Sequence, residues 1–493
     1  MSNAAVSIAT ADAGARSVRS ESFLATCFAG VLSSYFVLMA CSLYWLTRAG
    51  ATLFASVLPR SLIERAPIAW MMGSSLLVTA LTQCLPGFFP DYSSWSEIGL
   101  EMLVWLTLGL FARVYLVATS YPDTFPELRA SIASRPLERL LARHLHHPID
   151  AIFTRVWLAN SIAIIPLSVL LVLPATINYL VIIGYTVMLL LTQLPQEITD
   201  HTNIHTRIFQ PKLGASQLVK RLLGWLQIYF EWVLTLLVAR VPGYYRVQHI
   251  YVHHTEDNGP ADSQTTLPYD RTSFLDFSRH ALRQGVDLVT GWWVLSYLYR
   301  KGKIRPMRDV LRGLALWYAI LLVLAVVNPI AALVLFSSRF LGGNILSLIA
   351  FYWHGVVDPE DHQGAHGNSI EYVGSGHGNL GDDFHAVHHL RPGRHWSHYY
   401  EEFTKQEQRG HPGVVMQKEA FGPLMLVAAL WRRDFSTIGR YAMLGETTGD
   451  ALARIIEERT RPESGAERTG LVARLDRGLG RIMAAALPKT FGA

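Results

Sequence analysis

Residues 381–389 read Gly-Asp-Asp-Phe-His-Ala-Val-His-His and place three histidines, His385, His388 and His389, within five positions. On a helix, residues three and four apart lie on one face, so a single turn here presents several imidazoles together. Neutral imidazole binds zinc, copper, iron and nickel. The stretch therefore predicts a metal site, and it predicts helix around that site.

Two further histidine clusters precede this one, and the three clusters together hold eight imidazoles. They are His201-x-x-x-His205 and His249-x-x-x-His253-His254. We expect each cluster to direct its imidazoles to one point in space. Eight ligands suit two ions, whereas a structural zinc site needs four. Neither Glu-x-x-His nor His-Glu-x-x-His occurs, which disfavours the soluble di-iron bundles and the common zinc proteases.

Carboxylates lie close to the histidine clusters in the sequence. Metal-bound imidazoles usually donate their second ring N–H to a carboxylate or a carbonyl, which fixes the tautomer and the ring orientation. The candidates for this orienting role are Asp200, Glu256, Asp257, Asp382 and Asp383.

The composition indicates a multi-pass membrane protein. The chain has 493 residues, of which 51% are hydrophobic and 16% charged, and its mean hydropathy is +0.24. The three cysteines, Cys27, Cys41 and Cys84, are too far apart for a Cys-x-x-Cys site, so we expect no iron–sulfur or rubredoxin-like module within the chain. The net charge of +5 gives no reason to expect nucleic-acid binding.

Seven stretches are long and apolar enough to cross a bilayer as helices. They cover residues 23–46, 67–89, 98–119, 156–173, 175–194, 311–327 and 332–353. Asn328-Pro329 marks the turn between the last two. The expected fold is all-α: a polytopic transmembrane helix bundle of about seven spans, capped by a cytoplasmic helical histidine-box domain.

Basic loops orient these spans, because loops rich in Lys and Arg stay in the cytoplasm. Such loops follow the first and third expected spans, which places the histidine clusters on the cytoplasmic side. The apolar stretches 222–239 and 274–299 contain charged residues, so we expect both to lie in the membrane interface rather than to cross it.

The order and spacing of the three clusters resemble the histidine boxes of the membrane fatty acid desaturase superfamily, which includes alkane and fatty-acyl hydroxylases. The resemblance covers roughly residues 150–400. It implies a ninth ligand near the end of the span before the third box, where this chain has His354 in Phe-Tyr-Trp-His-Gly. The expected metal ligands are therefore His201, His205, His249, His253, His254, His354, His385, His388 and His389.

The resemblance also implies the chemistry and the partners. It predicts two iron ions, dioxygen as co-substrate, and a fatty acyl lipid, acyl-carrier or acyl-CoA substrate that is desaturated. Electrons would come from a separate ferredoxin, rubredoxin or cytochrome and its reductase. The second box, with three residues before its His-His pair, is similar to that of the membrane alkane hydroxylases, so hydroxylation is the alternative. A histidine-rich metal or proton transporter is a distant alternative, because transport calls for ionisable residues near the bilayer midplane.

The expected organisation follows from these assignments. Residues 1–22 form a disordered head, and residues 23–119 form an N-terminal transmembrane segment of three spans. Residues 150–400 form the catalytic region with the three boxes, and residues 401–493 form a cytoplasmic helical tail.

Overall fold

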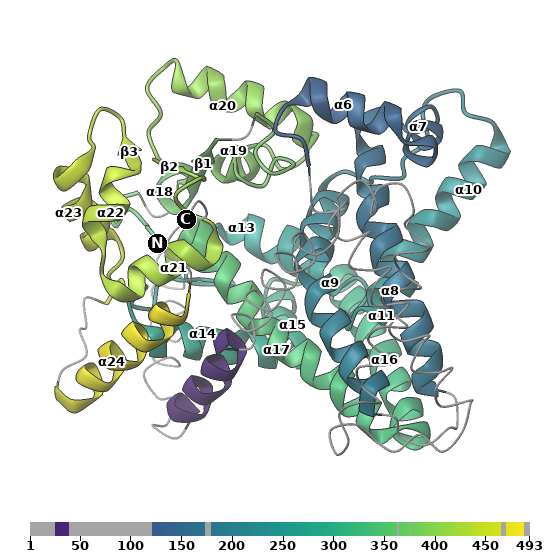
Figure 1. Cartoon of the computed structure of the whole chain (residues 1–493), viewed down its shortest axis with the longest axis horizontal. Coiled ribbons are helices and arrows are strands. Elements are labelled where there is room, and N and C mark those ends of the chain that lie inside the picture. The colour runs from purple at the N-terminus through teal and green to yellow at the C-terminus, as the bar shows by residue number, and fades with distance from the viewer. Residues whose placement is uncertain are drawn as a thin grey trace, which may run out of the picture.

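The computed structural model describes residues 25–38, 121–172, 179–361, 364–374, 376–464 and 470–487. The expected head at residues 1–22 and the second and third expected spans lie outside the described residues. Of the first expected span, the helix Ala25–Leu38 is described. Its residues Phe36 and Val37 belong to one buried cluster with residues of α14 (Phe274–Thr290), α17 (Pro329–His354) and α24 (Gly470–Ala486), which are far away in the sequence (Figure 1).

Three helical stretches among the described residues are long and apolar enough to cross a membrane. They are Pro148–Val169, which runs into α8 (Thr154–Val172), α16 (Ile304–Val327) and α17 (Pro329–His354). They coincide with the fourth, sixth and seventh expected spans. The fifth expected span falls largely within α9 (Tyr179–His205), which packs along α8 and carries the first histidine box at its end. The total of seven spans remains a prediction.

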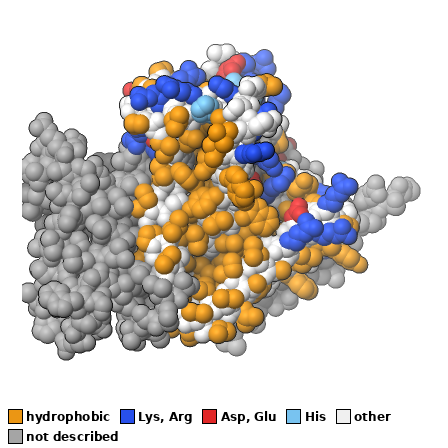
Figure 2. Space-filling view, turned by 90° about the vertical axis from the view of Figure 1, so that its right-hand side faces the viewer, with side chains coloured by type: hydrophobic (Ala, Val, Ile, Leu, Met, Phe, Trp, Pro, Cys, Tyr) orange, Lys and Arg blue, Asp and Glu red, His pale blue; other side chains and the backbone are white. Residues whose placement is uncertain are grey.

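The surface of the described residues reflects the apolar composition of the chain. Figure 2 shows apolar side chains over the middle and lower part of one face, with Lys and Arg gathered above them. On α16, Leu322, Val323 and Val326 are 69%, 62% and 80% exposed. Exposed aliphatic side chains in such a row suit a lipid environment rather than water.

The turn between α16 and α17 forms at Asn328-Pro329, as expected. The Asn328 side chain accepts a hydrogen bond from the Ala331 N–H, and Pro329 occupies the first helical position, where its missing N–H costs nothing. The two helices pack against each other as a hairpin. This hairpin carries His354 to the level of the histidine boxes.

Helix α14 (Phe274–Thr290), within the stretch 274–299 that is expected at the membrane interface, is packed inside the protein. Twelve of its residues are buried, and it packs along α17 and α24 (Gly470–Ala486) in the interior. Glycines allow α14 and α17 to approach each other closely. A Cβ added to Gly343 in α17 would lie only 2.3 Å from the backbone nitrogen of Gly285 in α14. Charged positions such as Asp287 are internal because they bond within the protein, here to the Tyr244 hydroxyl at 2.9 Å.

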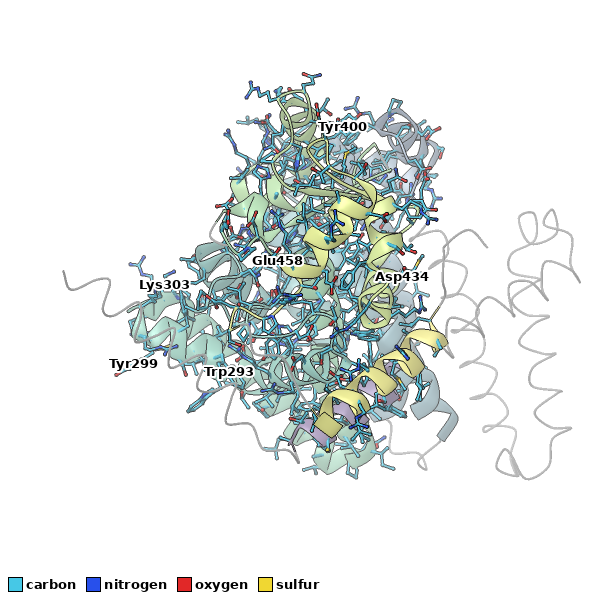
Figure 3. All side chains as sticks on the ribbon, turned by 90° about the vertical axis from the view of Figure 1, so that its left-hand side faces the viewer. Trp293, Tyr299, Lys303, Tyr400, Asp434 and Glu458 are labelled. Carbon is cyan, nitrogen blue, oxygen red and sulfur yellow. The ribbon has the colours of Figure 1, made fainter. Side chains whose placement is uncertain are left out.

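Only α15 (Trp292–Arg300) exposes large aromatic side chains in that segment. Trp292 is 65% and Tyr299 is 73% exposed. Figure 3 shows Trp293 and Tyr299 near the projecting edge of the molecule, with Lys303 close by.

Other helices complete the scaffold around the boxes. On the N-terminal side are α6 (Phe125–Ser134), α7 (Pro136–Ala142) and η1 (Pro148–Phe153). Between the first and second boxes are α10 (Gln217–Ile228), η2 (Tyr229–Leu234), α11 (Thr235–Leu237) and α12 (Tyr244–Gln248). The second box forms η3 (His249–His253) and α13 (His254–Glu256); later come α18 (Ala365–Asn368), α19 (His385–Leu390), η4 (Trp396–His398) and α20 (Tyr399–Glu407).

A small sheet corrects the all-α expectation. Its order is β1-β2-β3, with β1 (Ile370–Val373) parallel to β2 (Val414–Gln417) and β2 antiparallel to β3 (Ala442–Leu444). Three or four residues per strand are too short to give a clear alternating pattern in the sequence. The sheet ties the tail helices α21 (Pro423–Arg432), α22 (Phe435–Arg440) and α23 (Gly449–Arg459) to the region of the third box (Figure 1).

The glycine contact between α14 and α17 predicts a specific sensitivity. Gly343→Ala should destabilise the protein by about 1–3 kcal/mol, because the added methyl group meets the backbone of α14 and forces the helices apart. Thermal unfolding of the detergent-solubilised chain measures this.

The matched control is Gly224→Ala in α10, where nothing lies within 4 Å of the added Cβ. This substitution should be neutral or slightly stabilising, since alanine favours helix over glycine. Equal effects of the two substitutions would contradict the proposed role of the glycine contact.

Candidate metal centre

The structure brings all nine candidate histidines together in two adjacent groups. Within each group, every side chain offers one ligand atom, and these atoms lie within 4.8 Å of one another. Group one contains His201, His205, His249, His254 and His388; group two contains His253, His354, His385 and His389. Six of the nine are buried and three, His205, His254 and His389, are half-buried.

In group one, four Nε2 atoms point toward a common centre. The His201 Nε2 lies 2.9 Å from that of His249 and 3.0 Å from that of His388. The His254 Nε2 closes the ring at 3.1 Å from His249 and 2.9 Å from His388. A ring of nitrogens at such short spacing is the arrangement that a shared cation would stabilise.

Group two has the same character. The His385 Nε2 lies 3.0 Å from the His354 Nε2 and 3.2 Å from the His389 Nε2. The groups adjoin: the rings of His254 and His389 have their centroids 4.5 Å apart. The indole of Trp353 stacks on His385 at 4.4 Å and lies 6.0 Å from His201, so it contacts both groups.

The expectation that each box serves one point is wrong for the second and third boxes. His201 and His205, four residues apart on α9, both belong to group one. In the third box, His385 and His389 share group two, whereas His388 belongs to group one. The second box divides in the same way, with His249 and His254 in group one and His253 in group two. The second and third boxes therefore each contribute to both groups and connect them.

A π-helical turn explains how the second box divides. The His254 N–H donates to the His249 carbonyl, five residues earlier, within η3. In a π-helix, residues five apart share a face, so His249 and His254 both face group one while His253 faces group two. Only this wider turn aligns the first His with the last of the pair.

Hydrogen-bond acceptors behind the rings orient several imidazoles. The His201 Nδ1 is hydrogen-bonded to Asp382 at 2.8 Å. The His389 Nδ1 also lies 2.8 Å from an Asp257 oxygen, but in a close contact without hydrogen-bond geometry. When Nδ1 donates to a carboxylate, the lone pair of Nε2 faces the centre, as a metal ligand requires.

The other three predicted carboxylates bond elsewhere. Asp200 accepts from Gln196 at 2.8 Å and pairs with Arg240 at 3.3 Å. Glu256 accepts from the Tyr297 hydroxyl at 2.5 Å, and Asp383 accepts from the Lys418 ammonium at 2.5 Å. These three support the surrounding scaffold rather than the imidazoles.

Three orienting groups were not predicted from the sequence. Asp262 lies 2.6 Å from the His253 Nδ1, the Asn368 carbonyl accepts from His354 at 2.7 Å, and the Tyr399 hydroxyl lies 3.3 Å from the His388 Nδ1. Asp262 has a sequence signal, because the turn-forming run Asn258-Gly259-Pro260 lies between it and His253. In the structure, Asp257 and Asn258 adopt left-handed conformations there and turn the chain back toward the box. A backbone carbonyl and a tyrosine 11 residues beyond its partner carry no comparable signal.

The electrostatics keep most of the imidazoles neutral. Burial, reinforced by the neighbouring histidines, lowers the pKa of His249, His385, His388 and His389 well below the ordinary value. Burial also works to lower the pKa of His253, but contact with Asp262 outweighs it and the net shift is upward. Neutral imidazole is the form that binds metal.

Adjacent aspartates provide a test of the orienting role. Asp382→Asn should weaken metal binding by about 10–100-fold, because His201 loses the charged acceptor that sets its tautomer. Metal retained per chain after dialysis against graded chelator concentrations measures the change.

Asp383→Asn is the matched control, with the same loss of charge one residue away. It removes the ion pair with Lys418 and should leave metal affinity unchanged. Similar losses of metal in both variants would show that local charge, rather than the contact with His201, matters.

Comparison with known proteins agrees with this geometry. Residues 214–416 match the family model described as fatty acid desaturase. The match includes the second and third boxes and His354, and it begins just after the first box. Neither the curated proteins nor the solved structures contain a significant match. Over residues 214–416, the match confirms the resemblance to the membrane fatty acid desaturase superfamily that the histidine boxes indicate.

Proposed function

We propose that the protein is a membrane-bound, oxygen-dependent non-haem di-iron desaturase that introduces a double bond into a fatty acyl chain. The observation that carries the proposal is the pair of adjoining imidazole groups, seven of whose nine histidines lie within the residues that match the fatty acid desaturase family model. Group one offers five imidazoles and group two offers four. Each group therefore has enough ligands for one ion without a carboxylate ligand.

The residues fit two iron ions. Ring nitrogens converge at 2.9–3.2 Å in both groups, and acceptors behind His201 and His253 direct the Nε2 lone pairs inward. Imidazole is a suitable ligand for iron, zinc and copper alike. We propose iron among them because the matched family, fatty acid desaturase, is known for di-iron centres. Bound there, the irons would supply the reduction of dioxygen and the oxidation of an unactivated C–H bond.

The balance of the reaction defines what else is needed. In desaturation, two hydrogens from the acyl chain, two electrons and two protons reduce dioxygen to two molecules of water. The electrons come from a separate donor of the ferredoxin, rubredoxin or cytochrome type. The protein's own contribution is to hold the ligands rigidly and to exclude water, which the burial of six of the nine histidines supports.

The substrate is proposed to enter from the bilayer. Of the three apolar helices, α17 ends at His354 and so places its final residue in group two. An acyl chain could therefore extend between lipid and the metal groups while its head remains at the surface. We place that surface on the cytoplasmic side, from the distribution of basic loops.

A second candidate is hydroxylation of an acyl or alkyl chain at the same centre. The observation that favours it is the longer second box, with His249 five residues before His254 in a π-turn. In this reaction, one oxygen atom of dioxygen forms the alcohol and the other leaves as water, with the same demand for two electrons.

Metal analysis tests the centre directly. The purified chain should contain about two irons, one for each imidazole group, and His385→Ala should lose iron and activity together. Iron and zinc are measured by elemental mass spectrometry beside an activity assay.

His398→Ala is the control, because this exposed histidine lies outside both groups. It should keep iron and activity. Zinc as the resident metal, with His385→Ala still active, would overturn the di-iron proposal.

Product analysis separates the two reactions. Expression in a host of known lipid content, followed by mass spectrometry of its fatty acids, should reveal products lighter by two hydrogen atoms. Products heavier by one oxygen atom would instead establish hydroxylation. His253→Ala should abolish either product, since His253 belongs to group two; new lipids that persist in this variant come from the host.

A further inference from the structure

A third set of ligand-type side chains lies outside the two imidazole groups. His366 on α18, Glu371 on β1 and His411 before β2 each bring one potential ligand atom within 4.8 Å of the others. They come together because β1 and β2 are parallel neighbours, with Ile370 paired to Val414. Figure 1 shows α18 beside these strands.

These side chains are enclosed, yet each has a polar atom without a partner. Glu371 is 0% and His411 is 8% exposed, and His366 is half-buried. Among the described residues, none makes a hydrogen bond of ordinary distance and angle to the His366 Nδ1, the Glu371 Oε2 or the His411 Nε2, although His411 and the His385 backbone lie beside the Glu371 carboxylate and lower its pKa against the effect of burial. Buried polar atoms nearly always have partners, so three such atoms in one place indicate a missing shared partner.

The hydrogen bonds that do exist leave those atoms available. The Glu371 Oε1 accepts from the Val387 N–H at 3.2 Å, which leaves Oε2 free of that bond. The His411 Nδ1 lies 3.2 Å from the Gly413 carbonyl oxygen, to which it can donate, and 3.1 Å from the Gly413 N–H, from which it can accept. The Nε2 lone pair is open to a metal in the tautomer that donates to the carbonyl. That Nε2 lies 3.7 Å from the Glu371 Oε1, too far for a hydrogen bond but close to the spacing of two ligands on one ion.

The surrounding backbone is close-packed. A Cβ on Gly413 would lie 3.0 Å from the His366 carbonyl oxygen and 3.2 Å from the His411 Cε1. The loop before β2 is therefore held tightly against α18, so the three side chains are positioned in advance. Burial, reinforced by His411, also lowers the pKa of His366 to about 4, which keeps this imidazole neutral.

We propose that His366, Glu371 and His411 form a third, mononuclear metal site that binds a divalent transition-metal ion of the zinc class. Two imidazoles and one carboxylate are a common zinc ligand set, with a water in the fourth position. The ion would neutralise the buried carboxylate and provide a partner for all three unpartnered atoms. The site is separate from the two imidazole groups and does not depend on the proposed reaction.

Two contacts connect this site to the imidazole groups. Glu371 accepts from Val387 in α19, the helix of the third box. Two residues beyond His366, the Asn368 carbonyl orients His354. The third site is therefore connected through the backbone to α19 and to the acceptor of His354, while its own ligands belong to neither imidazole group.

Metal counting on the full-length chain tests the proposal. After expression with iron and zinc and dialysis against a weak chelator, the wild type should retain about one zinc per chain besides its iron. The double variant His366→Ala/His411→Ala should lose that zinc and keep the wild-type iron content. His144→Ala/His398→Ala removes as many imidazoles outside the three sets and should keep both metals.

Zinc retained by the double variant at the wild-type level, or a wild type without the additional zinc, overturns the proposal. If the double variant does not fold, His366→Asn, which changes the most exposed ligand, is titrated with Co²⁺ in the iron-loaded protein. Loss of the visible cobalt absorption with iron retained supports the site, and an unchanged absorption overturns it. The iron count, measured in the same samples, reports separately on the proposed di-iron centre.

Discussion

The burial of nine imidazoles around two adjacent points is the constraint on which the rest of this structure depends. Neutral imidazoles packed nitrogen to nitrogen repel one another through their lone pairs, and burial removes the water that could separate them. Acceptors on the outer side of the rings, including Asp382 and Asp262, hold them in this arrangement. The packing and the acceptors around the rings therefore fix the geometry of the two imidazole groups, and a bound metal would add to the stability of the fold.

Long helices supply much of the rigidity that this arrangement needs. Two of the four segments that carry ligand candidates lie at the ends of such helices: α9 ends at His205 and α17 ends at His354. The second box instead continues the short helix α12 directly into η3. The close contact of α14 and α17 at Gly285 and Gly343 fixes α17 laterally. The third box is different, because its short helix α19 is anchored by Glu371 on the small sheet rather than by a membrane helix.

Much of the site could be predicted from sequence because histidine spacing maps simply onto helical faces. The nine histidines named from the boxes and His354 are the nine that the structure brings together. The division between groups could not be predicted, since a π-turn and an α-turn have no distinct signature in His-x-x-x-His-His. Among the carboxylates, Asp257 and Asp382 contact imidazoles, whereas Asp200, Glu256 and Asp383 bond to other side chains, because nearness in sequence does not determine side-chain direction.

The sequence by itself determined the apolar character of the chain and the two long helices α16 and α17 with their Asn328-Pro329 turn. It also determined which histidines cluster. Both follow because hydropathy and residue spacing are local properties. Only the tertiary structure decided that α14 is internal, that a short sheet joins the tail to the third box, and that His366, Glu371 and His411 meet. Each of these depends on contacts between residues far apart in the chain. Burial of a helix and pairing of strands between residues distant in the sequence follow from how the helices pack, and no local sequence pattern predicts them.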